Sequence, residues 1–248
     1  MATVAENLQT ILDIKSDIKD AIVAKGVSVA DSDSFGSYAD KIGEISGGHT
    51  SIDVGALGLK FAYSSFEQVP DIFSFDNISD MRWMFGFCEE LTSVPLFDTS
   101  KVEDFSNAFR STKLTTIPLF DTSNVINMEY LFYYNTTIES IPQLDAGNCK
   151  TISNAFYNCK NLTNVGGFNN FGKYESTATY QNDKSLWFPS SDKLTYESCM
   201  NIFYNVYDMT SFDYRKTASI KLHSTPYSLL TDDDIAIATN KGWIVESA

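Results

Sequence analysis

The sequence has few of the residues that hold metals or carry out acid–base catalysis. It contains two histidines, His49 and His223, and four cysteines, none of which forms a Cys-x-x-Cys pair. A structural zinc site needs several such ligands close together, so we expect no metal and no cofactor. Nothing in the spacing of serine, histidine and aspartate suggests a catalytic triad. We therefore expect a protein that is not an enzyme.

Long apolar runs and an excess of basic residues are also missing. No stretch approaches the roughly 20 apolar residues that a membrane-spanning helix needs, so we expect no membrane insertion. The start, Met1–Glu6, lacks the basic and apolar regions of a secretory signal, which favours maturation in the cytosol or prior removal of a signal. The formal net charge of -14 would repel phosphate backbones, so we expect no nucleic-acid partner.

What the sequence does have is an internal repeat of 23 to 24 residues. Its four copies are Ser74–Phe97, Asp98–Phe120, Asp121–Leu144 and Asp145–Phe168, called repeats 1 to 4 below. Aligned copies share apolar columns, the clearest of which is Phe85, Phe109, Phe132 and Phe156. One copy has too few apolar residues for a core, so we expect the copies to stack and each column to form an internal ladder.

Spacing within a repeat predicts its local structure. Val102, Phe105 and Phe109 are three and four residues apart, which predicts a helical turn, and residues 114–118 predict a short strand that ends at a proline. Aspartates at the starts of repeats 2 to 4 predict Asx turns. Residues 50–73 follow the pattern weakly and are expected to form an atypical first repeat.

The chain ends differ from the repeats. The isoleucines Ile11, Ile14, Ile18 and Ile22 predict an amphipathic helix that mediates oligomerisation, because a short helical segment has little core of its own. Residues 184–248 predict larger strand–helix units, with Thr195 and Thr231 as helix caps. We therefore expect three parts: 1–48, helical and used for attachment or oligomerisation; 49–183, the repeats; and 184–248, the C-terminal units and cap.

Two sets of side chains raise the question of function. Cys88 and Cys159 share a column three repeats apart, ~14 Å at ~4.8 Å per strand step, so free thiols are expected rather than a disulfide. Several tyrosines bracket the apolar Phe132, so some must point outward. Exposed aromatic rings stack on sugars or anchor protein partners, whereas packing between repeats is the more common alternative. The candidate ligand contacts are Tyr130, Tyr133, Tyr134 and Tyr157.

The repeat columns resemble the BspA-like, Treponema pallidum-type leucine-rich repeats. The segments Val102–Phe109 and Cys159–Val165 carry the resemblance, which covers about residues 50–168. It implies an α/β fold, a right-handed leucine-rich-repeat solenoid with a helical N-terminal segment. Residues 14–45 resemble a short helical segment at the N-termini of tailed-phage structural and fibre proteins, where trimers are common.

These resemblances imply a non-enzymatic virion structural protein of a tailed phage, either a fibre or a decoration protein. Residues 1–48 would bind other virion proteins or further copies of the chain, as a possible homotrimer. The solenoid would bind a host-surface glycan or protein, and the protein would lie in the virion after assembly in the host cytoplasm. The first alternative is a bacterial cell-surface leucine-rich-repeat adhesin. The second is a glycan depolymerase, which requires paired carboxylates in a groove.

Overall fold

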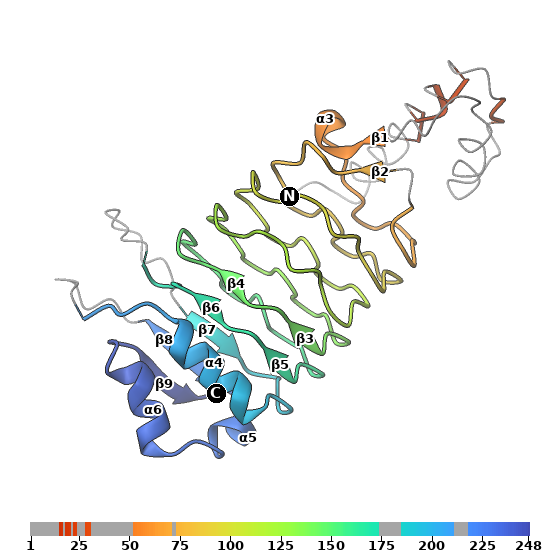
Figure 1. Ribbon diagram of the computed structural model, residues 1–248. Coiled ribbons are helices and arrows are strands. Elements are labelled where there is room, and N and C mark those ends of the chain that lie inside the picture. Colours follow the sequence, from red (N-terminus) through yellow and green to blue (C-terminus); the bar gives the residue numbers. More distant parts are fainter. Residues whose placement is uncertain are drawn as a thin grey trace.

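A computed structural model describes residues 15–16, 18–20, 22–23, 28–30, 52–70, 73–173, 185–210 and 218–248. The repeats lie side by side in the order of the sequence, from β1 and β2 at one end of the row to β9 at the other (Figure 1). Each repeat therefore contacts mainly the repeats before and after it, as expected for stacked units.

Strands in the repeats are short and pair in parallel. The pairs are β1 (Ile52–Asp53) with β2 (Phe73–Ser74), β3 (Ser140–Ile141) with β5 (Asn164–Val165), and β4 (Leu144–Asp145) with β6 (Phe168–Asn169). Isolated parallel bridges such as Asp104 to Asn127 connect further repeats. The helix α3 (Val54–Leu57) begins at Asp53, whose side chain accepts the N–H of Ala56. Residues 52–53 thus pair with residues 73–74, where repeat 1 begins.

The C-terminal part has longer elements. A three-stranded parallel sheet contains β7 (Ser185–Phe188), β8 (Ser219–Leu222) and β9 (Ile244–Ser247) in that order. Between these strands lie α4 (Tyr196–Asn205), α5 (Ser224–Tyr227) and α6 (Asp232–Thr239).

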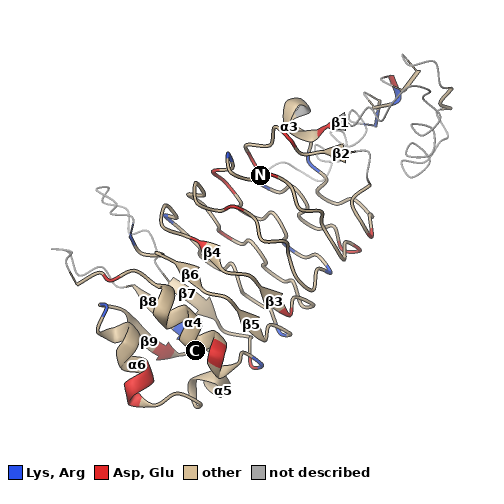
Figure 2. Cartoon of the chain, viewed as in Figure 1, with Lys and Arg blue, Asp and Glu red and all other residues tan. Residues whose placement is uncertain are grey.

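Helix caps in this part agree with the sequence-based prediction. The Thr195 hydroxyl accepts the N–H of Ser198 at the start of α4. At α6, Thr231 and Asp234 form a reciprocal capping box, and the acidic first turn faces the positive end of the helix dipole (Figure 2). Thr231 thus has the capping role expected of it, and Asp234 is the first-turn aspartate that completes the box.

The helical turn predicted within each repeat is wrong. In repeat 2, the Phe105 N–H donates to Asn127 O (2.8 Å) and the Phe109 N–H donates to Leu131 O (3.0 Å), both in repeat 3. Within the repeat, Ala108 N–H bonds only three residues back, to Phe105 O (3.1 Å). An α-helix would bond each N–H four residues back in its own segment. Turns of this kind also place residues three or four apart on one side, so the apolar spacing imitates a helix.

The expected fold class is corrected accordingly. The described residues form few helices and small, separate parallel sheets, not the α/β leucine-rich-repeat solenoid that the columns suggested. Between Leu57 and Tyr196, the described residues contain turns, two-residue strands and the four-residue β7, but no helix. The expected helical segment 1–48 lies largely outside the described residues, and the three predicted boundaries stay predictions.

Left-handed backbone recurs twice in every repeat. The residues with positive φ are two positions before or two positions after the ladder phenylalanine: Trp83, Phe87, Asn107, Ser111, Tyr130, Tyr134, Asn154 and Asn158. This conformation costs an L-residue about 1–2 kcal/mol and interrupts any α-helix. Hydrogen bonds from these same residues to the next repeat, such as Ser111 N–H to Tyr133 O (2.9 Å), offset the cost.

Stacked phenylalanines form the centre of the core. The rings of Phe61, Phe85, Phe109, Phe132, Phe156 and Phe188 stack in succession, with centroid separations of 5.8, 5.9, 5.7, 6.1 and 4.8 Å. All six are buried. The sequence predicted the ladder up to Phe156, but its continuation onto Phe188 of β7 comes from the tertiary structure.

A column of small polar side chains lies beside this ladder. Its buried members, three positions after each phenylalanine, are Cys88, Thr112, Asn135, Cys159 and Ser191. Cys88 Sγ donates to Phe61 O (3.0 Å) and Ser191 Oγ donates to Cys159 O (3.1 Å). Burial raises the pKa of the Cys88 thiol to about 12, so it stays protonated. All four cysteines are free and buried, which confirms the prediction of unpaired thiols.

Turns between repeats use the aspartates as expected. The N–H of the residue two positions on donates to Asp98 Oδ1 (2.9 Å), Asp121 Oδ1 (3.0 Å) and Asp145 Oδ1 (3.0 Å). Hydrogen bonds from the Ser123 side chain and backbone hold the pKa of Asp121 below its ordinary value. These side chains therefore fix the turns as acceptors.

Only part of the predicted oligomerisation helix is described. Ile18 and Ile22 lie in helical backbone and are 4% and 2% exposed within the single chain, while Ile11 and Ile14 lie outside the described residues. Burial within one chain leaves Ile18 and Ile22 little area to offer to another copy. The oligomerisation role stays a prediction.

The ladder predicts a large effect of removing one ring. Phe132→Ala should lower the free energy of unfolding by about 3–5 kcal/mol, because it leaves a cavity between Phe109 and Phe156. Leu119→Ala, at a side chain 67% exposed, is the control and should change it by less than about 0.5 kcal/mol. Urea denaturation measures both, and equal midpoints for the two variants would contradict the ladder.

The left-handed positions predict an unusual preference for glycine. Ser111→Gly should leave stability unchanged or raise it by up to about 1 kcal/mol, because glycine adopts φ 52 without strain. Ser111→Val should lower it by about 1 kcal/mol or more, because a β-branched residue tolerates this conformation poorly. Thermal unfolding compares the two, and a less stable glycine variant would argue against strain at this column.

Candidate functional site

Aromatic side chains gather on the outer surface of the repeats, beside the turns that carry the phenylalanine ladder. Tyr63, Trp83 and Tyr134 are exposed by 48%, 36% and 47%, and the others are half-buried. We call this set the aromatic strip: Tyr63, Trp83, Phe87, Arg110, Tyr130, Tyr133, Tyr134, Tyr157 and Trp187. Most members lie one or two positions from a ladder phenylalanine, so their surface alignment follows from the inward position of the ladder.

Ring contacts run along the strip from repeat to repeat. Tyr63 stacks on Phe87 at 4.9 Å between centroids, and Trp83 stacks on Phe87 at 5.9 Å. Further along, Tyr133 stacks on Tyr157 at 5.2 Å. Tyr157 then contacts the Trp187 ring at 5.8 Å. These contacts form two groups of rings, one from Tyr63 to Phe87 and one from Tyr130 to Trp187.

Arg110 bridges these two groups of rings. Repeat 2 has no aromatic residue in the strip, and the Arg110 guanidinium fills the gap. Its central carbon lies 4.7 Å from the Tyr133 ring centroid, 5.0 Å from Phe87, 5.5 Å from Trp83 and 5.7 Å from Tyr130. Each such contact stabilises by about 0.5–1 kcal/mol at an exposed site.

The charge of Arg110 has no acidic partner in the described part of the chain. Its Nη1 donates to Asn107 Oδ1 (3.2 Å), while its buried Nε has no hydrogen-bond partner there. The aromatic faces therefore hold a cation that no described carboxylate neutralises.

Gly86 makes room for the Trp83 ring. A Cβ atom at this position would lie 2.7 Å from Cε3 of Trp83, closer than real contacts allow. The column that contains Gly86 has Arg110 in repeat 2 and Tyr133 in repeat 3. The missing side chain in repeat 1 thus lets the indole lie flat beside Phe87.

The candidate ligand contacts named from the sequence meet in this strip. Tyr130, Tyr133, Tyr134 and Tyr157 form one cluster, with Tyr133 and Tyr134 4.8 Å apart. Burial, followed by the neighbouring tyrosines, raises the pKa of the Tyr133 phenol. Packing between repeats and exposure to a ligand are both found here. The four rings contact one another across repeats 3 and 4, and Tyr134 is still 47% exposed.

Five members of the strip were missed by the sequence analysis: Tyr63, Trp83, Phe87, Arg110 and Trp187. Trp83 and Phe87 share the alignment columns of Tyr130 and Tyr134, so reading the columns outside the core would have found them. Arg110 carried no such signal, because its role depends on the rings of both neighbouring repeats.

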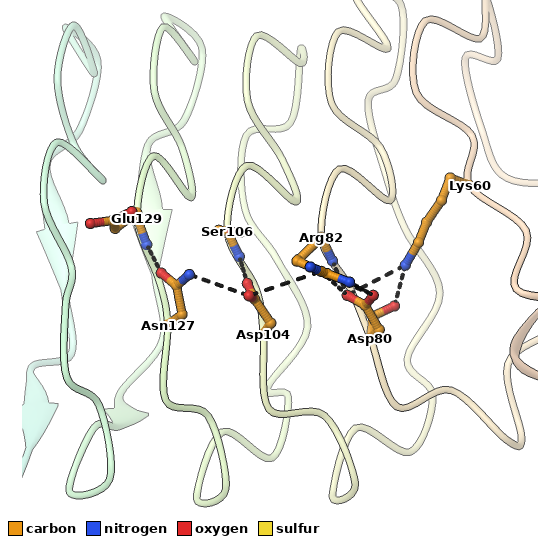
Figure 3. Close-up of polar contacts among 7 residues, drawn as sticks. All are labelled: Lys60, Asp80, Arg82, Asp104, Ser106, Asn127 and Glu129. Carbon is orange, nitrogen blue, oxygen red and sulfur yellow. Dashed lines mark hydrogen bonds and ion pairs between the residues drawn. The ribbon is translucent and has the colours of Figure 1, made fainter. Parts of the chain in front are cut away.

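A polar ladder runs beside the strip, through positions five residues before the ladder phenylalanine (Figure 3). Asp80 accepts hydrogen bonds from the Arg82 side chain, with Nη2 at 2.8 Å, and pairs with Lys60 Nζ at 3.6 Å. Arg82 Nε lies 4.0 Å from Asp104 Oδ2 and so connects repeats 1 and 2.

The ladder continues into repeat 3. Asp104 Oδ1 accepts the Ser106 N–H (2.8 Å) and its Oδ2 accepts from Asn127 Nδ2 (3.3 Å). Asn127 Oδ1 in turn accepts the Glu129 N–H (2.9 Å). Most polar side chains labelled in Figure 3 thus form hydrogen bonds or ion pairs with other residues of the ladder. Such internal pairing is typical of residues that stabilise the structure.

At the C-terminal end of the strip the surface is hollowed. The lining residues are Thr136, Thr137, Lys160, Asn161, Pro189, Ser190, Asp192, Lys193 and His223. Lys193 Nζ donates to Asn161 Oδ1 (2.6 Å), and His223 Nδ1 accepts the Thr225 N–H (3.2 Å) at the start of α5. In the neutral form, the proton of this histidine is therefore on Nε2.

The residues that the structure describes contain no group of three or more His, Cys, Asp or Glu side chains arranged to hold a metal ion. Nor does any helix in these ranges combine the length and apolar character needed to cross a bilayer.

Comparison with known proteins places the repeats in a family. Residues 61–187 match the family described as "Mycoplasma protein of unknown function, DUF285". The chain belongs to this family. Neither a curated protein nor a solved structure matches the chain. The DUF285 match covers repeats 1 to 4 and every member of the aromatic strip, so the family region contains this candidate site.

The resemblances stated from the sequence are corrected by this result. The match over the repeats is to DUF285, and the comparisons support neither a BspA-like leucine-rich-repeat protein nor a tailed-phage protein. The columns that suggested the first are real, but the structure builds turns and short strands from them. The apolar spacing therefore identified the repeat correctly, but the prediction that it is a leucine-rich repeat is wrong.

The polar ladder predicts a small, pH-dependent contribution to stability. Burial alone would raise the pKa of Asp80, but hydrogen bonds from Arg82 and the charges of Lys60 and Arg82 hold it below its ordinary value. This stability is present above about pH 4 and is lost as the pH falls through the folded-state pKa. Asp80→Asn should therefore destabilise the chain at pH 7 by less than about 1 kcal/mol.

Thermal unfolding from pH 7 to pH 3 measures this contribution. The difference between wild type and Asp80→Asn should shrink below about pH 4. Glu103→Gln, at an exposed carboxylate, is the control and should change stability by less than about 0.5 kcal/mol. A difference that stays constant across the range would show that the Asp80 charge is not its source.

Proposed function

We propose that this chain is a non-enzymatic binding protein that recognises a glycan through the aromatic strip. The observation that carries the proposal is the pair of ring groups, Tyr63 to Phe87 and Tyr130 to Trp187, which Arg110 connects and which have exposed faces at Tyr63, Trp83 and Tyr134. Aromatic rings present an apolar face for stacking and, in tyrosine and tryptophan, a polar group for hydrogen bonding. Sugars offer both kinds of surface.

The strip is preorganised, which supports a binding role. Each ring contacts at least one neighbour, and Arg110 contacts four. Side chains already held by such contacts lose less conformational entropy when a ligand binds. Tyrosine, tryptophan and arginine are also the residues that most often dominate binding energy.

Backbone strain gives a second line of support. Trp83, Tyr130 and Tyr134 hold bulky rings at positive φ, while the same columns carry Asn107 and Asn158 elsewhere. Asparagine tolerates this conformation better than an aromatic residue does. The repeat thus accommodates a less strained side chain, and the rings at these positions are best explained by a function of their own.

A row of similar rings in successive repeats suits an extended ligand. A polymer with repeating units can place one unit after another along the row and gain a contact at each. The alternative ligand is a protein. It would bind at a different surface, where Leu96 and Leu119 of repeats 1 and 2 expose apolar side chains.

Other expectations from the sequence stay predictions. These are a place in the virion or on a bacterial surface, a homotrimer through residues 1–48, and the alternative of a glycan depolymerase. The proposal made here depends on the strip and on none of them.

Removing two exposed rings tests the proposal. The Trp83→Ala/Tyr134→Ala variant should bind at least tenfold more weakly to whichever immobilised polysaccharide the wild-type chain binds in a panel of neutral and acidic polymers. Its melting temperature should fall by no more than about 4 °C, because both rings lie outside the buried core and are exposed by 36% and 47%. Biolayer interferometry and calorimetry measure the two effects.

A matched control uses the other exposed surface. Leu96→Ala/Leu119→Ala removes apolar area of two neighbouring repeats outside the strip and should bind as the wild type does. If the wild-type chain binds no polysaccharide, or if the ring variant binds normally, glycan recognition by the strip is excluded.

A further inference from the structure

We infer that the glycan bound by this strip carries acidic groups and that the hollow beside the strip receives them; this inference rests on the proposed function. The hollow holds Lys160 and Lys193. Tyr157 precedes Lys160 by three residues, and Trp187 precedes the lining residue Pro189 by two. These short separations keep the hollow near the last two rings of the strip, so a polymer on those rings can place an acidic group in the hollow.

The inference rests on two lysines of the hollow, Lys160 and Lys193, whose charges are not paired with a carboxylate. Several basic side chains elsewhere form ion pairs, as in Lys113–Glu90 (2.6 Å) and Lys221–Glu246 (3.3 Å). Neither Lys160 nor Lys193 lies within ion-pair distance of a carboxylate in the described part of the chain. The same holds for Lys101 and Lys173, so what sets Lys160 and Lys193 apart is that they line one hollow together. Arg110 also has no such partner and lies in repeat 2, two repeat steps from Lys160.

The neighbouring groups are suited to an anion as well. Thr136, Thr137, Asn161 and Ser190 line the hollow with hydroxyl and amide donors. Asp192 is the single carboxylate among the lining residues, so two lysines against one acid leave this surface positive when His223 is neutral. Hydrogen bonds from a charged lysine to a carboxylate are about twice as strong as neutral ones.

The overall charge of the chain does not oppose such a ligand at short range. Acidic residues are spread over the whole chain and give it a net charge of -14 (Figure 2). At physiological ionic strength, charges more than ~8 Å apart are largely screened. The cations that line the hollow therefore act on a ligand there more strongly than the distant acidic residues do.

Paired polymers that differ only in charge test the inference. The full chain is measured against immobilised polygalacturonate, alginate, hyaluronan and polysialic acid, each beside its carboxyl-reduced form. At least one acidic polymer should be bound, with at least tenfold lower affinity for its reduced form. Lys160→Gln/Lys193→Gln should lose about as much affinity for the acidic form. Lys101→Gln/Lys173→Gln changes the net charge equally outside the strip and the hollow, and should bind as the wild type does.

The outcomes separate this inference from the proposed function. Equal binding of an acidic polymer and its reduced form would overturn the acidic preference and leave glycan binding intact. Loss of binding in Trp83→Ala/Tyr134→Ala but not in Lys160→Gln/Lys193→Gln would overturn the role of the hollow alone. Absence of binding to every polymer, acidic or reduced, would overturn both.

Discussion

Backbone hydrogen bonds between adjacent repeats are the constraint on which the other features of this chain depend. Around each ladder phenylalanine, alternate N–H groups donate to carbonyls of the next repeat, as Phe85, Phe109 and Phe132 all do. An N–H group bonded in this way is not available to a helix, and the left-handed residues among these donors also interrupt helical backbone. The same bonds hold successive repeats in register, so equivalent residues stack at equivalent places.

Register then separates the side chains into an inner and an outer set. Phenylalanines and small polar residues lie inside, where Cys88 and Thr112 alike satisfy backbone carbonyls. In repeats 1 to 4, most residues two positions before or one or two positions after the phenylalanine are at least partly exposed, whereas the residue directly before it is buried. The core already fixes the backbone at these outer positions. A surface row of rings is therefore a consequence of the core ladder, and the identity of each outer residue is free to serve binding.

The outer row shows this freedom in repeat 2. Asn107 and Ser111 take the columns that are aromatic in repeats 1 and 3, and Arg110 replaces a tyrosine. The interruption does not break the strip, because the guanidinium reaches rings on both sides. In the aligned sequences, repeat 2 lacks the aromatic residues of repeats 1 and 3. In the structure, this is the place where the positive charge of Arg110 lies between aromatic rings.

The sequence by itself determined the repeat, its period, the phenylalanine column, the Asx turns and the caps at Thr195 and Thr231, because each depends on residues close together in the chain. It did not determine the type of repeat: apolar spacing of three and four residues fits a helical turn and a hydrogen-bonded turn equally, and the partner of each N–H lies in another repeat. Only the tertiary structure decided that choice. It also decided the site, since the environment of Arg110, the space at Gly86 and the hollow between Lys160 and Lys193 all arise from residues that meet through stacking.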